Sequence, residues 1–412
     1  MSSTATSIFQ PYLSPSLSAL LAEYLPASIP VDTLSRTPPA RLERTALPNI
    51  GLIELVSADD FQALYDPLYV HSFPRAAERE RSDLIVERLA AQARGQRKGL
   101  APYRIVGIRD HQGQAIGAAQ FSVLPVPPRM STTDITGSAA ADDNGGDGDG
   151  DGDGDGDSDD GTRLGAKYAV PYLQYIYVRA QNRRQDMSEV LHTMVLAVAA
   201  ADAALMDAED RAEDLDRGPE PDPDPTTASS SSSSAADSDP AMRRRARTVP
   251  FTLFETEPPD HGDDHASRAY ALERSKIHTS TGGMALVLRR PRRPQQNVPD
   301  SEDDDDEILS AHVQPGLEPS DPPLTLVWII RPSPTSTPGQ DYDLTRLGKA
   351  LVAAYYQSLR DEGFPPQNIA LAESIVAQRC RGGSVFQLMP LADVRDFSAD
   401  NKGNLDIKEW SN

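Results

Sequence analysis

The sequence predicts an α/β protein in which a mixed, mostly antiparallel β-sheet is flanked by helices. Two β-rich runs at 103–109 and 115–124 are separated by a short polar link that contains Gly113, which predicts an antiparallel hairpin. Behind this hairpin, strand-like and helix-like segments alternate along the chain. Three acidic low-complexity tracts interrupt the order, and their composition favours long disordered insertions because it offers too little apolar surface to bury.

The ordered part of the chain is expected to begin near Asn49. Residues 50–56 are rich in aliphatic side chains and predict the first strand. Ser57 is a favoured helix-capping residue and precedes a predicted helix at 58–64. Apolar residues recur at helical spacing within 75–92, which predicts a second helix. One strand and two helices therefore precede the hairpin.

The middle of the chain predicts a central strand followed by a long helix. Residues 172–178, YLQYIYV, combine tyrosines with β-branched residues, as central strands do. The helix runs from 186 to about 210 with an apolar face along its length. The remaining expected elements are strands at 249–255, 284–290 and 324–331, helices at 265–278, 343–360 and 368–379, and a short last strand at 384–388.

Charge is distributed very unevenly along the 412 residues, whose net charge is −22. The tracts at 142–160, 207–240 and 300–307 together hold more negative charge than the whole chain, so the remainder is slightly basic. The acidic character therefore belongs to the insertions and gives no indication of the ligand.

These observations predict one folded domain with interruptions and extensions. Long inserts are tolerated in surface loops because the entropy of loop closure grows slowly with length. We expect a flexible lead-in at 1–48, a domain at 49–331 with disordered inserts at about 130–165, 207–247 and 291–322, a helical extension at 343–396 that packs on the domain, and a tail at 397–412.

Cysteine usage and the N-terminal composition predict an intracellular protein. A single cysteine, Cys380, excludes an intramolecular disulfide framework and is typical of a reducing compartment. Residues 1–30 have no basic segment before their apolar residues, and no run approaches the roughly 20 apolar residues of a membrane span. Arginine clusters at 243–247 and 289–293 lack interleaved aromatic residues. We expect a cytoplasmic or alternatively nuclear protein without membrane or nucleic-acid partners.

No metal site is expected from the sequence. The Gly-Asp alternation at 146–157 has carboxylates but neither an apolar anchor nor a closing glutamate, so it is typical of a solvated polyelectrolyte. The tail at 398–409 matches several positions of a calcium-binding loop, but only three residues follow it, which leaves no exiting helix. Both patterns therefore favour chance similarity over metal binding.

The most informative segment is 176–192, where a β-rich run stops, a basic turn follows and a long helix begins at once. The free N–H groups of a first helical turn and the helix dipole attract an anion. Arg179, Arg183 and Arg184 add full positive charges, although an ordinary solvated turn is the alternative. The segment predicts a site that holds a pyrophosphate.

The element order and this segment resemble the GCN5-related N-acetyltransferase (GNAT) family, whose fourth strand runs into a pyrophosphate loop of the pattern Gln/Arg-x-x-Gly-x-Gly/Ala. The ungapped match covers Val178, Arg183, Met187, Ser188 and Leu191. Asp186 stands where the family has its first glycine, which lets backbone amides approach the phosphates. The carboxylate either lowers the affinity for an anion or serves as the cap of the helix.

The resemblance implies an N-acyltransferase, with acetyl-CoA as cosubstrate and an amine of unknown type as acceptor. The coenzyme would lie in the gap where the fourth and fifth strands separate, with a fourth-strand amide polarising the thioester carbonyl. The alternative is a GNAT-like module that has lost its chemistry and acts by binding or scaffolding. The implied coenzyme-binding residues are Tyr177, Val178, Arg179, Arg183, Arg184, Gln185, Asp186, Met187 and Ser188.

Direct transfer needs a base for the amine and an acid for the leaving thiolate. Glu255 ends the predicted fifth strand and is the favoured base, with Glu257 and, more remotely, Glu54 as alternatives. The resemblance places His278 where the family has a tyrosine that acts as the general acid, and Tyr270 is the alternative acid. The simpler interpretation makes the glutamates solvated strand-end residues and His278 a partner of the helix dipole.

Overall fold

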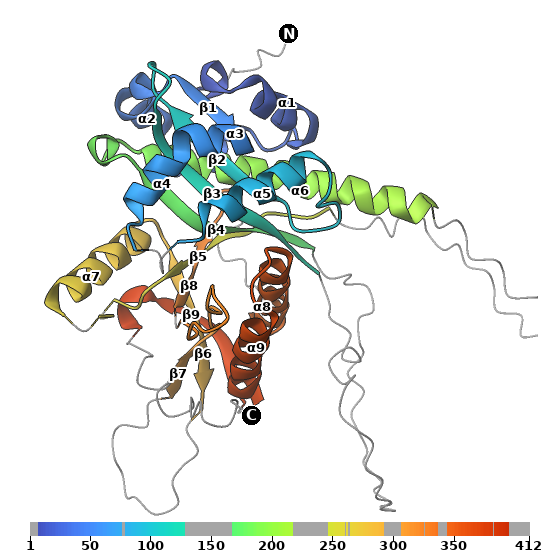
Figure 1. Ribbon diagram of the computed structural model, residues 1–412, viewed down its shortest axis with the longest axis vertical. Helices are drawn as coiled ribbons and strands as arrows, with labels where there is room; N and C mark the ends of the chain where they lie inside the picture. The colour runs from blue at the N-terminus through green and yellow to red at the C-terminus, as the bar shows by residue number, and fades with distance from the viewer. Residues whose placement is uncertain are drawn as a thin grey trace, which may run out of the picture.

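The computed structural model has one mixed β-sheet with helices on both faces, as the sequence predicts (Figure 1). Across the described residues, the sheet has nine strands: eight follow the order β1-β2-β3-β4-β5-β8-β6-β7, and β9 pairs with β6. The structure describes residues 7–75, 79–127, 167–216, 246–259, 261–262, 264–291, 306–324, 326–336, 344–381 and 383–394.

The first four strands form an antiparallel meander of β1 (Leu52–Leu55), β2 (Tyr103–Arg109), β3 (Ala115–Val126) and β4 (Tyr168–Val178). The β2–β3 turn places Gly113 at φ 77°, a conformation that glycine adopts without steric strain. Asp110 Oδ1 accepts the amides of Gln112 and Gln114 across this turn. The predicted hairpin is confirmed.

The second half of the sheet begins with a parallel pairing. β5 runs parallel to β4 and antiparallel to β8, and β6 pairs antiparallel with β7, β8 and β9. The last strand therefore joins the residues after 344 to the same sheet. The bounds are β5 (Phe251–Thr256), β6 (Met284–Arg290), β7 (Glu307–Ser310), β8 (Val327–Pro332) and β9 (Val385–Pro390).

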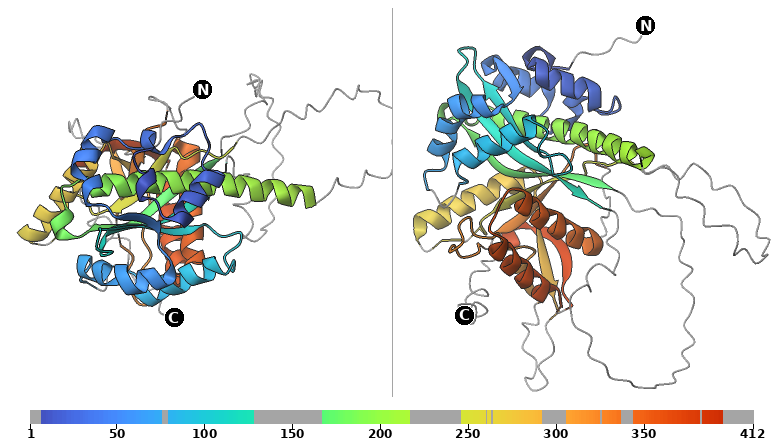
Figure 2. Two further views of the ribbon diagram at one scale, coloured as in Figure 1. Left: turned by 90° about the horizontal axis from the view of Figure 1, so that it is seen from above. Right: turned by 45° about the vertical axis from the view of Figure 1, so that its right-hand side comes forward.

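The two faces of the sheet carry different helices (Figure 2). On one face α6 crosses the strands, with α1 and α2 packed over it, and α7 lies beside β5 through Phe254 and His278. On the other face α4 and α5 cover the first strands, whereas α8 and α9 cover the last ones. The bounds are α1 (Pro15–Tyr24), α2 (Pro39–Thr45), α3 (Ala58–Asp60), α4 (Asp66–Ser72), α5 (Ser82–Ala93), α6 (Met187–Asp216), α7 (His265–Ser280), α8 (Leu344–Asp361) and α9 (Pro366–Arg381).

A β-bulge in β4 changes which side chains share a face. Gln120 pairs with Tyr175 and Phe121 with Leu173, so Gln174 is the extra residue. As a result Gln174 and Tyr175 both contact groups on the face opposite α6. Leu173, in contrast, packs in the core under α6. The bulge thus directs two consecutive polar side chains to one face.

A gap opens between β4 and β5 toward their carboxyl ends. Their parallel ladder consists of two pairs, Tyr172 with Leu253 and Leu173 with Phe254. β4 continues to Val178 without β5 beside it, and the two ribbons separate (Figure 1). Beyond Leu173, β4 therefore has a ladder partner on one side, in β3, and alternate backbone groups on its other side face the gap.

Residues 7–48 are folded, which corrects for them the expectation of a flexible lead-in at 1–48. Within it, Leu17 and Leu42 are fully buried in the core on the α6 face, together with Leu21 and Leu34. Ser14 caps α1 by accepting the amide of Leu17. The segment contains short apolar pieces divided by prolines, and these gain stability by packing in one core with α6.

The limits expected for two inserts are also corrected. α6 extends to Asp216, so the insert expected at 207–247 begins with helix. Within the insert expected at 291–322, the structure describes β7 and the fully buried His312. The insert expected at 130–165 and the tail at 397–412 lie outside the described residues.

Helix α6 combines great length with an apolar composition. Its portion Met187–Glu213 is long and apolar enough to cross a membrane by length and composition, yet 89% of its most hydrophobic window is buried inside the protein. Its buried side chains meet β2, β3 and β4. In this fold the helix is the centre of the hydrophobic core.

Candidate functional site

The loop after β4 forms a corner at the N-terminus of α6. β4 ends at Val178, a 3₁₀ turn covers Ala180–Asn182, and α6 begins at Met187. Among the described residues, no acceptor takes the backbone amides of Met187 and Ser188. Free first-turn amides and the dipole of a 30-residue helix make this corner suitable for an anion.

Two non-glycine residues of this corner have left-handed backbone. Arg184 has φ 63° and Asp186 has φ 56°. Glycine adopts this conformation more readily because it has no Cβ atom. Asp186 therefore carries a side chain at a backbone conformation that glycine would adopt without strain.

The Asp186 carboxylate points toward α2. Arg41 donates to it through Nε at 3.0 Å and a terminal nitrogen at 2.9 Å, and Thr45 Oγ1 donates at 2.6 Å. The side chain therefore does not cap α6, although Asp186 O accepts the amides of Glu189 and Val190. The pairing with Arg41 neutralises the charge that would oppose a phosphate.

The three arginines of the loop differ in how free they are. Arg179 donates to Asn182 Oδ1 at 2.8 Å and to Asp110 at 3.0 Å, so its charge is already paired. Arg183 is exposed and its Nε contacts the carbonyl oxygen of Val178 at 3.3 Å. Arg184 is also exposed. Arg183 and Arg184 are thus the positive charges that an anion in the corner would meet.

Two of the predicted coenzyme-binding residues have side chains turned away from solvent. Tyr177 packs among aromatic rings on the face opposite α6, and its hydroxyl accepts from Gln120 at 3.1 Å. Met187, the first residue of α6, is buried in the core. Gln185 is tied to Asn49 at 3.3 Å. These three residues can therefore contribute backbone groups to the corner, but their side chains are engaged elsewhere.

A buried glutamate beside the corner was missed from the sequence. Glu189, in the first turn of α6, accepts the backbone amide of Arg36 at 2.7 Å and the side chain of Arg331 at 2.7 Å. The Arg36 guanidinium donates to the carbonyl oxygens of Thr281 and Pro332. The N-terminal segment thereby fastens α6, α7 and β8 together, and no sequence motif signals such long-range pairs.

Glu255, the predicted base, lies on the face opposite the corner. Its carboxylate accepts the hydroxyl of Tyr172 at 2.6 Å and the indole N–H of Trp328 at 3.3 Å. His312 Nε2 lies 2.7 Å away. Burial alone would raise the pKa of Glu255, but His312 and the Tyr172 hydroxyl lower it below its usual value. A buried carboxylate held ionised in this way is a weak base.

His278 and Tyr270, the predicted acids, do not meet Glu255. His278 packs against Phe254 near the gap, where burial and then Arg274 lower its pKa to about 4. Its imidazole is therefore neutral at pH 7 and poorly suited to give up a proton. Tyr270 is 64% exposed, and the Arg274 guanidinium lies over its ring.

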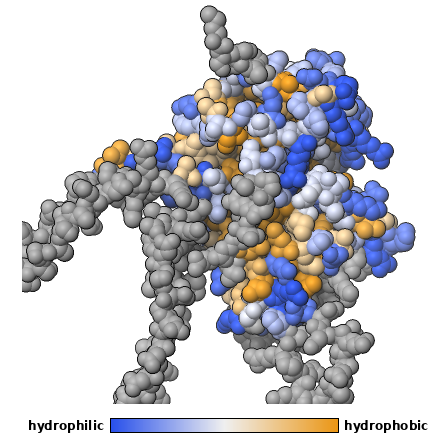
Figure 3. Space-filling model, turned by 180° about the vertical axis from the view of Figure 1, so that it is seen from behind, coloured by the Kyte–Doolittle hydropathy of each residue, from blue (hydrophilic) through white to orange (hydrophobic). Residues whose placement is uncertain are grey.

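The surface on the side hidden in Figure 1 is unevenly polar. Figure 3 shows that hydrophobic residues gather in the lower middle of this side.

The alternative bases are also paired. Glu257 forms an ion pair with Arg274 at 2.8 Å. Glu54 is buried and accepts from Arg109 and from the hydroxyl of Tyr65 at 2.7 Å. Both carboxylates therefore have structural partners, in line with the simpler interpretation of strand-end glutamates.

A polar cluster at the β4 bulge was not foreseen. Gln174 Nε2 donates to both carboxylate oxygens of Glu362 at 2.9 Å, and Ser122 Oγ donates to the same carboxylate at 2.8 Å. Gln174 Oε1 is buried and takes no donor among the described residues. A glutamine inside an aromatic and aliphatic strand was the one available signal.

The cluster continues through a buried arginine. Arg88 donates to Glu80 and lies 3.8 Å from Glu362, so one guanidinium faces two carboxylates. The Glu80 amide donates to the Tyr175 hydroxyl at 3.0 Å. Burial raises the pKa of Glu80, and Arg88 offsets this only in part. The two β4 residues at the bulge thus each contact an acidic residue: Gln174 contacts Glu362, and Tyr175 contacts the backbone of Glu80.

Comparisons with known proteins give one weak likeness. Protein-family models and curated proteins were searched, and neither comparison finds a match. A solved structure described as histone acetyltransferase HPA2 and related acetyltransferase, from Corynebacterium glutamicum, aligns with 70% of this chain and 97% of its own, at 12% identity and a TM-score of 0.25. A likeness of this size assigns neither family nor reaction.

Proposed function

We propose that this protein is an acyl-CoA-dependent N-acyltransferase that takes acetyl-CoA. The single observation that carries the proposal is that the β4–β5 ladder ends at Leu173, so that an unpaired edge of β4 runs to the corner where Met187 and Ser188 present free amides. An elongated thioester with a diphosphate at one end would lie along this edge, with its diphosphate at the corner. The same combination supports the GNAT resemblance of the sequence.

The roles of this chain's groups follow from their positions. The corner amides with Arg183 and Arg184 would hold the diphosphate. Backbone amides of β4 beyond Leu173 would hold the thioester carbonyl and stabilise the charge that develops on its oxygen. The amine nitrogen attacks the carbonyl carbon, the carbon–sulfur bond breaks, and a proton from the nitrogen ends on the thiolate. The predicted acid and base residues fit the proton transfers poorly. Glu255 is buried and paired, His278 is neutral at pH 7, and Tyr270 is exposed to solvent.

Replacing Arg183 with alanine is expected to weaken acetyl-CoA binding about tenfold, since it removes a charge-assisted contact worth about 1.4 kcal/mol. Isothermal titration calorimetry measures the dissociation constant. Arg211→Ala, at an exposed site near the other end of α6, is the matched control and should leave the affinity unchanged. Equal affinities for the wild type and Arg183→Ala would contradict the assignment of the corner.

Replacing Asp186 with glycine is expected to tighten acetyl-CoA binding several-fold, because it removes a carboxylate and the strain of a Cβ atom at φ 56°. Asp186→Asn separates the two causes, since it removes the charge and keeps the Cβ atom. The same titration measures both variants. Weaker binding in both would mean that the Arg41 pairing is needed to shape the loop.

A binding or scaffold module without chemistry is the second candidate. The observation that favours it is the pairing of the Asp186 carboxylate with Arg41 and Thr45, because it places a satisfied acidic group beside the corner. A folded protein by circular dichroism that gives no heat with acetyl-CoA would support this candidate and reject the first.

A further inference from the structure

The face of the sheet that α6 covers carries exposed apolar side chains at its far end. Val385 of β9 is 46% exposed, and Met389 of β9 and Ile308 of β7 are partly exposed. Arg289 of β6 pairs with both Val385 and Ile308, so these side chains lie in one row on one face of the sheet. Met389 and Ile308 pack against the core that contains α6, which identifies the face. We call the three apolar side chains, Ile308, Val385 and Met389, the β9 patch.

The helices among the described residues leave the β9 patch open to solvent. α8 packs on β9 from the opposite face, through the core that contains Phe386 and Leu388. α7 contacts β5 through Phe254 and His278, and Figure 1 shows β6 and β7 running on beyond it. The view from behind in Figure 3 has hydrophobic residues in the lower half, where these strands lie. An apolar sheet face of this kind is normally covered by another element.

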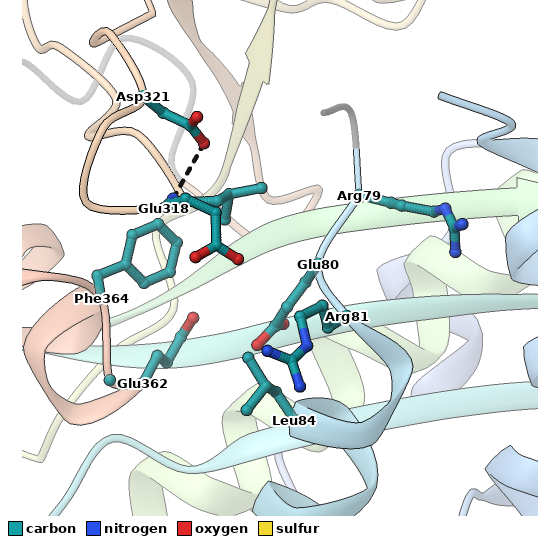
Figure 4. A pocket seen from close by; sticks show the side chains of 10 residues that line it. Arg79, Glu80, Arg81, Leu84, Glu318, Asp321, Glu362 and Phe364 are labelled. Carbon is teal, nitrogen blue, oxygen red and sulfur yellow. Dashed lines mark hydrogen bonds between the residues drawn. The ribbon is translucent and has the colours of Figure 1, made fainter. Parts of the chain in front are cut away.

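The cavity of about 300 Å³ on the opposite face is different in kind. It lies at the turn between α8 and α9, and Figure 4 shows carboxylates and arginines around it. Glu80 and Glu362 in its wall already face the buried Arg88. The buried carboxylates of this cavity are therefore paired within the protein, whereas the β9 patch has no partner among the described residues.

The chain leaves the sheet beside the β9 patch. β9 ends at Pro390, and the 3₁₀ turn Leu391–Asp393 follows it. Leu391 and Val394 are buried in the same core against which Met389 packs. Residues 395–412 begin at this point and lie outside the described residues. Fully extended, a segment of this length spans about 60 Å, whereas a six-residue strand such as β9 is about 20 Å long, so the segment is long enough to return over the patch.

The composition of residues 395–412 suits an apolar surface. Most of the segment is polar or charged, and its apolar residues are Phe397, Ala399, Leu405, Ile407 and Trp410. Leu405 and Ile407 are two positions apart, so an extended chain presents both to the same side. Apolar side chains set in a polar segment gain free energy by leaving water, and the β9 patch is adjacent to the point where the segment begins.

We propose that residues 395–412 bind the β9 patch of their own chain through the apolar side chains at 405, 407 and 410. The segment then acts as a strap that covers this end of the sheet. It also keeps the patch from a second copy of the protein, to which an exposed apolar sheet face would bind. The strap does not depend on the proposed acyltransferase function.

Acrylamide quenching of tryptophan fluorescence in the full-length protein tests the strap. The chain has two tryptophans, and Trp328 is fully buried, so quenching reports on Trp410. The quenching constant should be several-fold lower than that of a synthetic peptide of residues 395–412. Val385→Asp places a charge in the patch and should raise the constant toward that of the peptide. Leu84→Asp, at a leucine of α5 with a similar exposure of 39%, is the control and should leave it unchanged.

A change within the segment keeps the test valid if Val385→Asp disturbs the sheet. Ile407→Asp should raise the quenching constant in the same way, whereas Asn404→Asp, which adds the same charge at a polar position, should not. Circular dichroism checks the fold of each variant. Peptide-like quenching in the wild type, unchanged quenching in folded Val385→Asp or in Ile407→Asp, or an equal rise in the controls would overturn the strap. A full-length dimer in analytical ultracentrifugation that Val385→Asp converts to a monomer would assign the patch to a second copy and overturn it as well.

Discussion

Asp202→Ala is expected to lower the free energy of unfolding by about 3 to 5 kcal/mol, as breaking a buried ion pair does. Asp202 lies on α6 with a side chain that is 0% exposed, and it accepts two hydrogen bonds from Arg104 of β2 at 3.0 and 2.5 Å. The substitution leaves the Arg104 guanidinium under the helix without its counter-charge. Urea unfolding followed by circular dichroism measures the loss.

The matched control is an ion pair at the surface. Arg360 and Glu373 form one between α8 and α9, with both side chains more than a third exposed. Glu373→Ala should therefore change the unfolding free energy by less than about 1 kcal/mol. A similar small change in Asp202→Ala would mean that α6 is held on the sheet by its apolar face alone.

Acidification from pH 7 to pH 5 is expected to lower the unfolding free energy by about 2 kcal/mol through His278, and His192 acts in the same direction. Burial lowers the pKa of both imidazoles, with Arg331 adding to the effect, and His278 falls to about 4. In the unfolded chain the pKa of a histidine is near 6.5. Between this pH and the lower pKa of the folded state, the unfolded chain therefore binds a proton that the folded protein does not bind. The stability is complete above pH 6.5 and is lost as the pH falls toward 4.

Urea midpoints across this pH range measure the effect, and Trp328 is a buried fluorescent reporter. His278→Gln should flatten the dependence by about one proton, because the replaced side chain no longer titrates. His71→Gln, at an exposed position, is the control and should leave the slope as it is. A wild-type curve that is flat between pH 7 and pH 5 would contradict the burial of the two imidazoles.

Local patterns in the sequence predicted much of the sheet. The hairpin needed only Gly113 between two β-rich runs, and the strand at 172–178 and the helix after it followed from composition and periodicity. The corner at Arg183 was predicted for the same reason, since strand, turn and helix are adjacent in the chain. Where one segment determines its own conformation, the sequence was sufficient.

Features that depend on distant partners were not predicted. Leu17 and Leu42 lie in short, proline-divided pieces whose helices are stabilised by α6, far along the chain. The Gln174 bulge is a register change between two strands, and Glu362 meets it from the end of α8. Glu255 was placed at the end of the correct strand, but its neighbours His312 and Trp328 decide its charge state. No periodicity encodes such contacts.

The folding of residues 7–49 onto α6 has a consequence for synthesis on the ribosome. These residues are translated long before α6, the helix that shelters Leu17 and Leu42. Until α6 has been made, Leu17 and Leu42 lack the core that buries them. Exposed apolar side chains of this kind recruit chaperones to a nascent chain. A shortened chain without residues 7–49 would have the converse defect, because the apolar side of α6 that these residues cover would be exposed to solvent.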